Sequence, residues 1–459
     1  MRSRPQVGLK RELGLRDLVL TQILFVVGLS NFGNSAKLGA SHAVFWLTAI
    51  VLFYIPLAMV VIHLNRWRPL EGGLYQWAKA AFGEMAGFLI AWNLWVYAVI
   101  ATASILFVIP TDTGYMLGPS AAWLASSKLA TMSITCAVIA GITLVAIHGL
   151  DIGKWLHNIG SVMVLLAYVI LIGLPLWALA RGSIHRYEPI PLELPRLNMF
   201  TLAVFGQMTV GALSGFEYVA ILAGECRSAA RTVGQSVIIS APIISLMFIL
   251  GTSSVLTFIG SQPINVIGPI PQAMRIAFGA ASLVAPGAIF LLIARAIASA
   301  SLLFTGLTRL PMTAGWDNLV PRWFTRLHPV HGTPVNSILF MAALVLGLIL
   351  LSMLGVREQE SSQLLAIGSS VHYAIVYIAL FAIPLFGRTA APPWLKPIAW
   401  GRSAVQRHFA FCRGLSHSRR CEQSPLHCQN RHRPDSGEPH RHPGLPAGQP
   451  PVTLRYSVE

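Results

Sequence analysis

The sequence predicts an all-α polytopic membrane protein, with ten transmembrane helices arranged as two inverted halves of five. The chain of 459 residues is 54% hydrophobic and only 11% charged, whereas about a quarter of a soluble domain is charged. Ten apolar segments approach the length of about 20 residues that a helix needs to cross a bilayer. Two of them, the first and the sixth, are interrupted by glycine-rich stretches at matching depths, so we expect helices 1 and 6 to be broken.

The chain begins with a polar segment, residues 1–16, which we expect to be a cytoplasmic tail without a cleavable signal peptide. Its basic residues are Arg2, Arg4, Lys10, Arg11 and Arg16. Lys and Arg are also more frequent in the loops that would share its side of the membrane, as the positive-inside rule requires. We therefore expect a multi-pass protein of the cell membrane with its N-terminus in the cytoplasm.

The apolar segments follow one another with short connections. We expect spans at residues 18–38, 43–64, 84–109, 130–149, 156–180, 200–223, 236–259, 284–308, 337–354 and 364–386. Five spans in each half turn the second half upside down relative to the first, which is the topology of an inverted repeat. The expected core is residues 17–397, with repeat one at about 17–180 and repeat two at about 198–387.

The two interruptions are the strongest indication of function. The first reads Gly28-Leu29-Ser30-Asn31-Phe32-Gly33 and the second reads Gly211-Ala212-Leu213-Ser214-Gly215. Every backbone N–H and C=O inside a bilayer needs a partner, so unwound chain at mid-depth indicates a polar ligand. A pair of such breaks in corresponding positions is typical of the substrate site of a secondary transporter. The alternative is close helix packing through small residues.

The chemistry of the breaks indicates a zwitterionic ligand. Half-helix N-termini attract anionic groups, and bared carbonyls attract cations such as an amine or Na⁺. An amino acid suits both. The candidate substrate-binding residues are Gly28, Ser30, Asn31, Gly33, Gly211, Ser214, Gly215 and Glu217.

Two charged residues fall at membrane depth, where charge is costly and usually functional. Glu217 follows the second break and is a candidate to hold a substrate amine or carry a proton; a structural polar pair is the alternative. Arg295 lies near the middle of the eighth span. It is a candidate for a charge pair with Glu217, for gating, or for binding a substrate carboxylate.

Hydroxyl groups on the eighth span suggest an ion site. Ser299, Ser301 and Thr305 follow Arg295, and oxygen ligands facing the first break would suit Na⁺. The alternative is that each hydroxyl bonds to its own helix backbone.

Several other classes of protein are not indicated. The sequence lacks the phosphate-binding, zinc-protease, nucleophile-elbow and dinucleotide motifs, so we expect no cofactor and no enzyme activity. The cysteine and histidine spacing in the tail matches no zinc module, so we expect no metal. The net charge of +16 does not indicate nucleic acid, because the basic residues lie mostly in loops that set topology.

Three motifs in order resemble the amino acid–polyamine–organocation (APC) superfamily of permeases, over residues 9–397. The first is Pro69-Leu70-Glu71-Gly72-Gly73-Leu74-Tyr75-Gln76-Trp77. The second is Ser214-Gly215-Phe216-Glu217, and the third runs from Arg309 to Asn336 and includes Gly332-Thr333-Pro334. The resemblance implies the leucine-transporter fold, with ten core helices in two inverted repeats and usually two peripheral helices. It also implies transport of amino acids or related amines by alternating access, with the backbone at both breaks binding substrate.

The chain departs from the superfamily pattern in three places. The first break lacks the more common Gly-Ser-Gly type of sequence. Val164 stands where some proton-coupled relatives have a lysine, which leaves Na⁺, H⁺ by another route, or exchange open. The third departure is the basic, Pro-, His- and Arg-rich segment 398–459, which we expect to be disordered and not native to the fold, with a reading-frame change as our hypothesis.

The function predicted from these observations is a secondary active transporter of amino acids or related amines, with the lipid bilayer and H⁺ or Na⁺ as its other partners. The alternative is a membrane protein of the same fold that does not transport, acting as a sensor or scaffold or being a defective product.

Overall fold

The structure, a computed structural model, describes residues 13–386 apart from 29, 71, 126, 261, 266, 280–281, 312–318 and 355–357, together with Leu395. Contacts divide the chain into residues 1–413 and 414–459, and all described residues belong to the first unit. The predicted cytoplasmic segment 1–16 is described only from Leu13, and the predicted tail 398–459 lies outside the described residues. The described secondary structure is helical, with one isolated bridge between Leu13 and Cys226.

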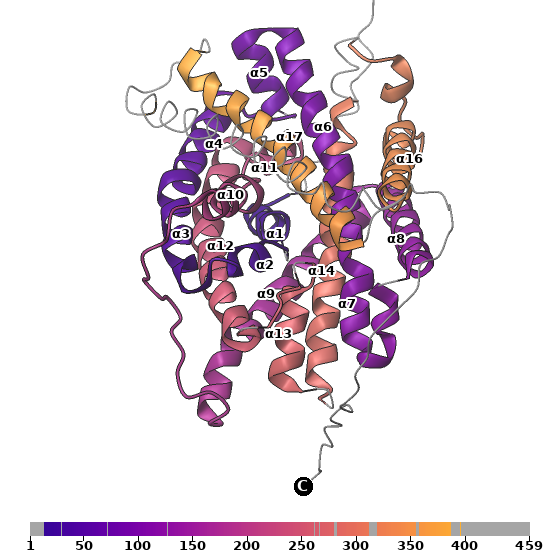
Figure 1. Cartoon of the computed structure of the whole chain (residues 1–459). Coiled ribbons are helices and arrows are strands. Elements are labelled where there is room, and N and C mark those ends of the chain that lie inside the picture. The colour runs from indigo at the N-terminus through magenta and orange to yellow at the C-terminus, as the bar shows by residue number, and fades with distance from the viewer. Residues whose placement is uncertain are drawn as a thin grey trace, which may run out of the picture. The chain divides into compact units, whose positions relative to one another are not determined.

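The first half of the described chain contains the interrupted first helix and the long helices that follow it (Figure 1). Its elements are α1 (Leu15–Val26), α2 (Ser30–Ala36), η1 (Gly39–Ser41), α3 (His42–Ala49), η2 (Ile50–Tyr54), α4 (Ile55–Trp67), α5 (Leu74–Phe82), α6 (Glu84–Leu106), α7 (Val108–Leu117), η3 (Pro119–Ala125), α8 (Lys128–His148) and α9 (Leu150–Ala180).

The second half repeats this order, with an interrupted helix first. Its elements are α10 (Met199–Gln207), η4 (Met208–Ala212), α11 (Tyr218–Ile221), η5 (Ala223–Glu225), α12 (Ala229–Ile259), α13 (Pro269–Phe278), α14 (Val284–Leu307), η6 (Arg322–Thr325), α16 (Val335–Ser352) and α17 (Glu358–Phe386).

The predicted all-α polytopic fold is confirmed, and eight of the ten predicted spans are found as continuous helices. Within the described residues, eight helices are long and apolar enough to cross a membrane: Gly39–Trp67, Glu84–Leu117, Lys128–His148, Gly153–Ala180, Ala229–Ile259, Val284–Leu307, Val335–Ser352 and Glu360–Phe386. The other two predicted spans are the interrupted ones. Their separate halves have 12 and 7 residues in the first case. In the second they are Met199–Ala212 and the 4 residues of Tyr218–Ile221. Each half is too short to cross alone.

The third span is longer than predicted. The helix does not end at residue 109 but turns at Phe107 and continues as α7 to Leu117. Pro110 lies in the first turn of α7, where proline is tolerated because the backbone N–H groups there have no partner within the helix. The extension places Asp112 inside the helical bundle.

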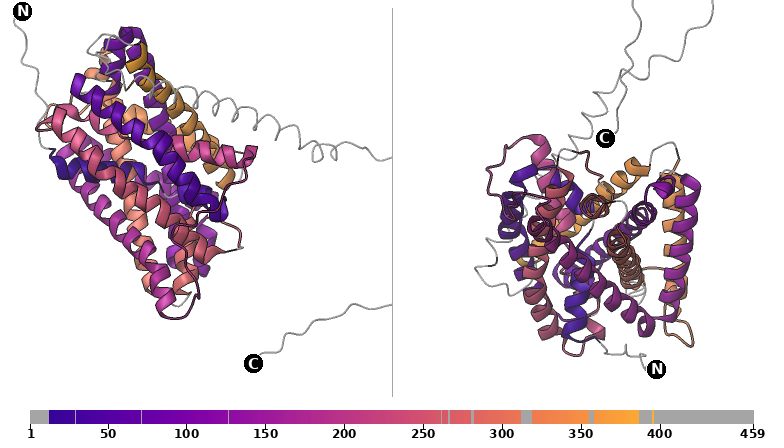
Figure 2. Two further views of the ribbon diagram at one scale, coloured as in Figure 1. Left: turned by 90° about the vertical axis from the view of Figure 1, so that its left-hand side faces the viewer. Right: turned by 90° about the horizontal axis from the view of Figure 1, so that it is seen from below.

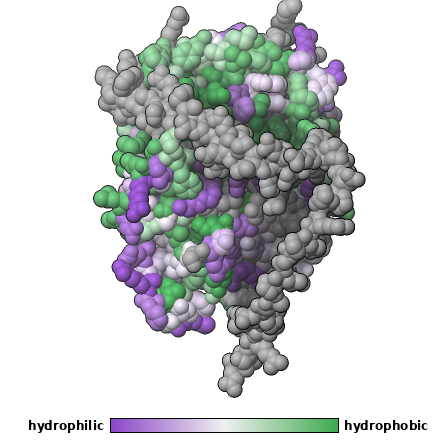
Figure 3. Space-filling model, in the orientation of Figure 1, coloured by the Kyte–Doolittle hydropathy of each residue, from purple (hydrophilic) through white to green (hydrophobic). Residues whose placement is uncertain are grey.

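The helices run alongside one another through the body of the unit (Figure 2). Among the described elements, α14 packs on α9, α17 packs on α6, and α1 packs on both α12 and α9. Large side chains fill the interior, among them the fully buried Trp46, Phe248 and Tyr377. The space-filling view of one face shows hydrophobic side chains gathered over its upper part and hydrophilic ones toward the lower left (Figure 3).

The tightest contact between α9 and α14 depends on Gly160. A Cβ at this position would overlap the Cβ of Ala298, whereas a Cβ at Gly173 on the same helix would meet nothing within 4 Å. We expect Gly160→Leu to destabilise the protein by roughly 1–3 kcal/mol through overpacking, and Gly173→Leu to change stability little. Thermal unfolding of the two detergent-solubilised variants measures the difference, and equal melting temperatures would contradict this packing.

Candidate functional site

The first interruption separates α1 from α2. The N–H of Val27 still bonds to Ile23, but the N–H of Gly28 turns back to the carbonyl of Val26 at 2.9 Å, and Val27 has the backbone angles φ −80° and ψ 88°. These angles resemble an inverse γ-turn, which ends the helix. The unwound stretch is shorter than predicted, because Ser30 begins α2.

The second interruption separates α10 from α11. The helix widens into the π-helical turn η4, with the N–H of Leu213 bonded to the carbonyl of Met208 at 3.0 Å; π-helical turns are frequent at functional sites. The chain then runs through Ser214 and Gly215 without helical structure. Gly215 has φ +118°, and its N–H donates to the Tyr377 hydroxyl at 3.0 Å.

The two interruptions lie against each other. The Asn31 amide is 3.5 Å from the Gly211 carbonyl oxygen, and the Cα of Gly215 lies directly against the ring of Phe25. Segments 180 residues apart in the chain therefore meet, as the inverted repeat predicts. Main chain without continuous helical structure from both halves therefore lies at one place.

A cavity of about 120 Å³ lies at this meeting point. Its wall combines both breaks with α6, the start of α7, α14 and α17. The predicted site residues that line it are Gly28, Asn31, Gly211, Ser214, Arg295 and Ser299. Its other polar lining residues, none of which is among the predicted site residues, are Tyr97, Ser104, Gln207, Ser362, Ser369 and Ser370.

The remaining predicted site residues do not line the cavity. Gly33 is buried within α2, and the side chain of Ser30 is outside the described part. Gly215 and Glu217 lie beside the cavity on the chain that leads to α11, and Ser301 and Thr305 lie further along α14.

Arg295 is the one charged side chain among the described residues of the cavity wall. It is only 4% exposed. One guanidinium nitrogen is 3.5 Å from the Ser299 hydroxyl, and Nε has no hydrogen-bond partner in the described structure. A buried guanidinium with an unused donor suits a carboxylate ligand, which accepts hydrogen bonds from Arg in a planar arrangement.

Glu217 contacts tyrosines instead of Arg295. Its side chain is fully buried, and it accepts a hydrogen bond from the Tyr373 hydroxyl. The rings of Tyr97 and Tyr377 have centroids 4.3 Å and 4.9 Å from that of Tyr373. Glu217 and Arg295, both described, form no ion pair with each other. Glu217 bonds to Tyr373, and Arg295 lies beside Ser299.

The three hydroxyl residues suggested for Na⁺ do not converge. Ser299 donates to the Leu24 carbonyl at 3.3 Å, near the end of α1. The Ser301 hydroxyl is 3.3 Å from His157, whereas Thr305 lines a separate small pocket with Asp17 and Arg309. Residues two and six positions apart on a helix point in different directions, which is why these hydroxyls face different neighbours.

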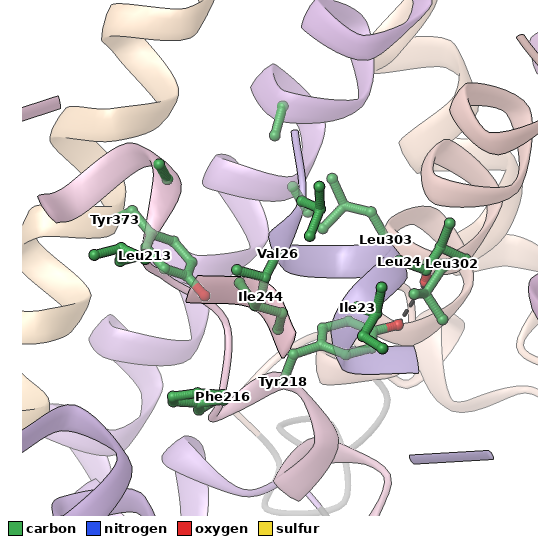
Figure 4. Close-up of a cluster of buried hydrophobic side chains, with 14 of the residues drawn as sticks. Ile23, Leu24, Val26, Leu213, Phe216, Tyr218, Ile244, Leu302, Leu303 and Tyr373 are labelled. Atoms are coloured by element: carbon green, nitrogen blue, oxygen red, sulfur yellow. Dashed lines mark hydrogen bonds between the residues drawn. The ribbon is translucent and has the colours of Figure 1, made fainter. Parts of the chain in front are cut away.

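The bundle is closely packed where α1, α11 and α14 meet beside the cavity. The ring of Tyr218 stacks on Phe25 with centroids 4.3 Å apart, and its hydroxyl donates to the Leu302 carbonyl at 2.5 Å. Figure 4 shows this ring beside Ile23, with the hydroxyl directed at Leu302. Residues of α1, α11 and α14 thus close this side.

An interrupted first helix and an interrupted helix in the second half, meeting at a polar cavity inside an apolar bundle, define a secondary transporter. The chain belongs to the amino acid permease family, whose model matches residues 13–412. It is a multi-pass membrane protein of the APC superfamily with transport as its function, and the non-transporting alternative is not favoured.

Several transporters are similar to this chain. An uncharacterised transporter of Legionella pneumophila is 24% identical, over 83% of this chain and 82% of that protein. Branched-chain amino acid permease BcaP of Bacillus subtilis is 22% identical, over 82% and 81%. The protein named probable agmatine/putrescine antiporter AguD of Lactococcus lactis is 24% identical, over 59% and 57%. The structure of MhsT in complex with L-phenylalanine has a TM-score of 0.63 and 12% identity, covering 88% of this chain and 100% of that one.

Proposed function

We propose that the protein moves amino acids that keep their α-carboxylate across the cell membrane by alternating access. The substrate carboxylate binds Arg295, and its amino group binds main-chain and hydroxyl oxygens at the two breaks. The observation that supports this is the position of Arg295 in a cavity wall whose described residues include no acid. A polyamine would add positive charge beside the guanidinium without a counter-charge, which is unfavourable in a low-dielectric site.

Matched pairs of amino acids and their decarboxylated amines test the substrate class. The pairs are L-ornithine with putrescine, L-arginine with agmatine, and L-leucine with 3-methylbutylamine. A ligand at about 100 times its Kd stabilises the folded state by about 2.7 kcal/mol, which thermal unfolding detects. We expect stabilisation only by members that have a carboxylate; stabilisation by the amines alone would contradict the proposal.

We propose that the N-terminus lies in the cytoplasm, because the loops on its side are the more basic. Labelling of single cysteines introduced at exposed Ser183 and exposed Arg322, in intact cells with a membrane-impermeant maleimide, tests the orientation. Only the cysteine at 183 should react, since the two positions fall in loops on opposite sides.

We propose that transport does not require Na⁺ at the hydroxyl residues of α14. Carbonyls of α1 that could coordinate a cation already accept hydrogen bonds from side chains, Leu24 from Ser299 and Leu20 from Ser161 at 2.9 Å. Uptake into proteoliposomes with choline in place of Na⁺ tests this. Loss of uptake in choline would show that Na⁺ is needed.

Glu217 is proposed to position the second break through its tyrosine neighbours. Tyr373→Phe removes the hydroxyl that donates to a Glu217 carboxyl oxygen. We expect the free energy of unfolding to fall by about 1–3 kcal/mol, because that buried oxygen loses its donor. Glu217→Gln keeps an acceptor for the Tyr373 hydroxyl, so we expect a smaller loss of stability, with transport slowed. A melting temperature lowered more by Glu217→Gln than by Tyr373→Phe would contradict this role.

A further inference from the structure

Asp112 is a buried acid that no part of the proposed substrate site uses. It lies on α7 with 0% of its surface exposed. Neither of its carboxyl oxygens has a hydrogen-bond partner in the described structure. Because a carboxylate buried without a partner is unfavourable, such a group indicates a role in binding a proton or another ligand.

Asp112 lies between two cavities. Val108, one helical turn earlier on α7, lines the substrate cavity. Thr111 and Gly114, on either side of Asp112 in the chain, line a second cavity of about 350 Å³ together with Asn265. A Cβ at Gly268 would lie 3.1 Å from Asp112 Oδ1, so glycine there leaves room for the carboxyl group.

Arg295 of the substrate cavity is the charged residue of α14, and α14 packs against α7, the helix of Asp112. The two side chains form no ion pair within 4.0 Å in the described structure. The hydroxyl of Tyr168, on α9, which also packs against α14, has no hydrogen-bond partner in the described structure. A carboxyl group and a guanidinium on two helices packed together thus each have polar atoms without a hydrogen-bond partner in the described structure.

The other titratable groups on the elements packed against α7 have different neighbours. Tyr115 of α7 itself faces Asp112 but is 3.1 Å from the Asn265 amide. Arg275 of α13 donates to the carbonyls of Tyr115 and Met116. The remaining groups are Glu84 and Tyr97 of α6 and Lys128, Cys136 and His148 of α8; of these, Glu84 pairs with Lys79, Lys128 donates to Met353 and His148 contacts Leu144.

We propose that Asp112 binds a proton when the substrate carboxylate binds Arg295, so that the two binding events are linked. This inference rests on the proposed function, since it requires a carboxylate at Arg295. In this scheme Asp112 is ionised while no substrate is bound, and its charge balances that of Arg295. When the substrate carboxylate takes that place, two negative charges would share one guanidinium, and protonation of Asp112 removes the second.

The proton comes from water on the side to which the cavity is open and adds to one oxygen of Asp112. It leaves on the other side after the substrate carboxylate leaves Arg295, when the Asp112 carboxylate again becomes the counter-charge. Substrate and proton then cross together. Each cycle moves one zwitterion, which has no net charge, and the single positive charge of the proton.

Proton uptake measured directly in weakly buffered detergent solution tests the linkage. A pH indicator follows the addition of a mixture of the twenty standard L-amino acids. We expect wild-type protein to take up as much as one proton per bound substrate, and Asp112→Asn to bind with no proton uptake. The KM for transport should rise with pH in the wild type, up to tenfold per pH unit, and be flat in Asp112→Asn. Unchanged proton uptake in Asp112→Asn would overturn the proposal.

A second measurement needs no substrate and separates this inference from the proposed function. Infrared difference spectra of the substrate-free protein on acidification should show a buried protonated carboxyl band that Asp112→Asn removes and Glu217→Gln does not. If this band is lost only in Glu217→Gln, Asp112 is not the proton site. If no amino acid in the mixture binds while the Asp112 band is present, the proposed substrate class fails and the titration of Asp112 stands.

Asp112→Glu is a second variant that tests the proposal if Asp112→Asn does not fold. It keeps the carboxyl group, and we expect it to retain proton uptake with a shifted pH dependence. A folded Asp112→Glu protein without proton uptake would overturn the proposal, because a merely structural acid would not affect the proton count.

Discussion

Replacement of Arg295 by alanine is expected to remove amino acid binding from the central cavity. Arg295 is 4% exposed and its Nε has no hydrogen-bond partner in the described structure, so a bound carboxylate would break no ion pair there. Hydrogen bonds to charged groups contribute about 1.5–3 kcal/mol, which corresponds to roughly 10- to 150-fold in affinity. Uptake of each carboxylate-bearing probe into proteoliposomes and thermal stabilisation by the same compounds measure the loss.

Two control variants accompany Arg295→Ala. Arg295→Lys retains a positive charge without the planar donors, and we expect intermediate affinity. Arg181→Ala removes an exposed arginine that stacks on Trp177 and should leave binding unchanged. Wild-type affinity in a folded Arg295→Ala protein would exclude Arg295 from the substrate site.

Gly215→Ala is expected to have the largest effect on stability. The residue has φ +118°, a conformation that costs of order 1–3 kcal/mol for residues with a side chain. Its Cβ would also overlap the ring of Phe25, which lies on the other interrupted helix. Overpacking adds typically 1–3 kcal/mol, so we expect a loss of about 2–6 kcal/mol and loss of transport.

Two comparisons separate the causes of that loss. Gly182→Ala also has positive φ, +71°, but its Cβ would meet nothing within 4 Å, so it reports the backbone cost alone. Phe25→Leu combined with Gly215→Ala removes part of the steric overlap and should recover part of the stability. Thermal unfolding measures all three, and Gly215→Ala with the stability of Gly182→Ala would show that the two breaks are not closely packed.

The main features of the fold were predictable because they depend on residue types that have few alternatives. Glycines at 28, 211 and 215 mark the breaks, since no other residue enters unwound or left-handed backbone so readily. The long apolar segments between them fix the continuous helices. The first break could not be bounded from sequence, because Asn31 and Gly33 are compatible with either helix or turn and only packing places them in α2.

The candidate site was predictable in part. Arg295 at membrane depth was identified from its cost in a bilayer, and the structure places it in the cavity wall. The charge pair suggested between Arg295 and Glu217 is not formed. The sequence does not show how each helix is rotated about its axis, so it could not exclude this pair. Asp112 was missed because Pro110 and Asp112 together resemble a loop, whereas α7 continues through both. A search for acids just beyond a predicted span end would have found it.

The bridge at the start of the described chain limits how the closed side can open. Leu13 pairs with Cys226, and the Arg227 N–H donates to the Leu13 carbonyl at 3.2 Å. This contact ties the lead-in to α1 to the chain that leaves α11. An outward swing of α1 alone would break it, whereas a joint displacement of both half-helices preserves it. The two half-helices on this side therefore form one mechanical element, whose hinges are the two unwound segments that surround the substrate.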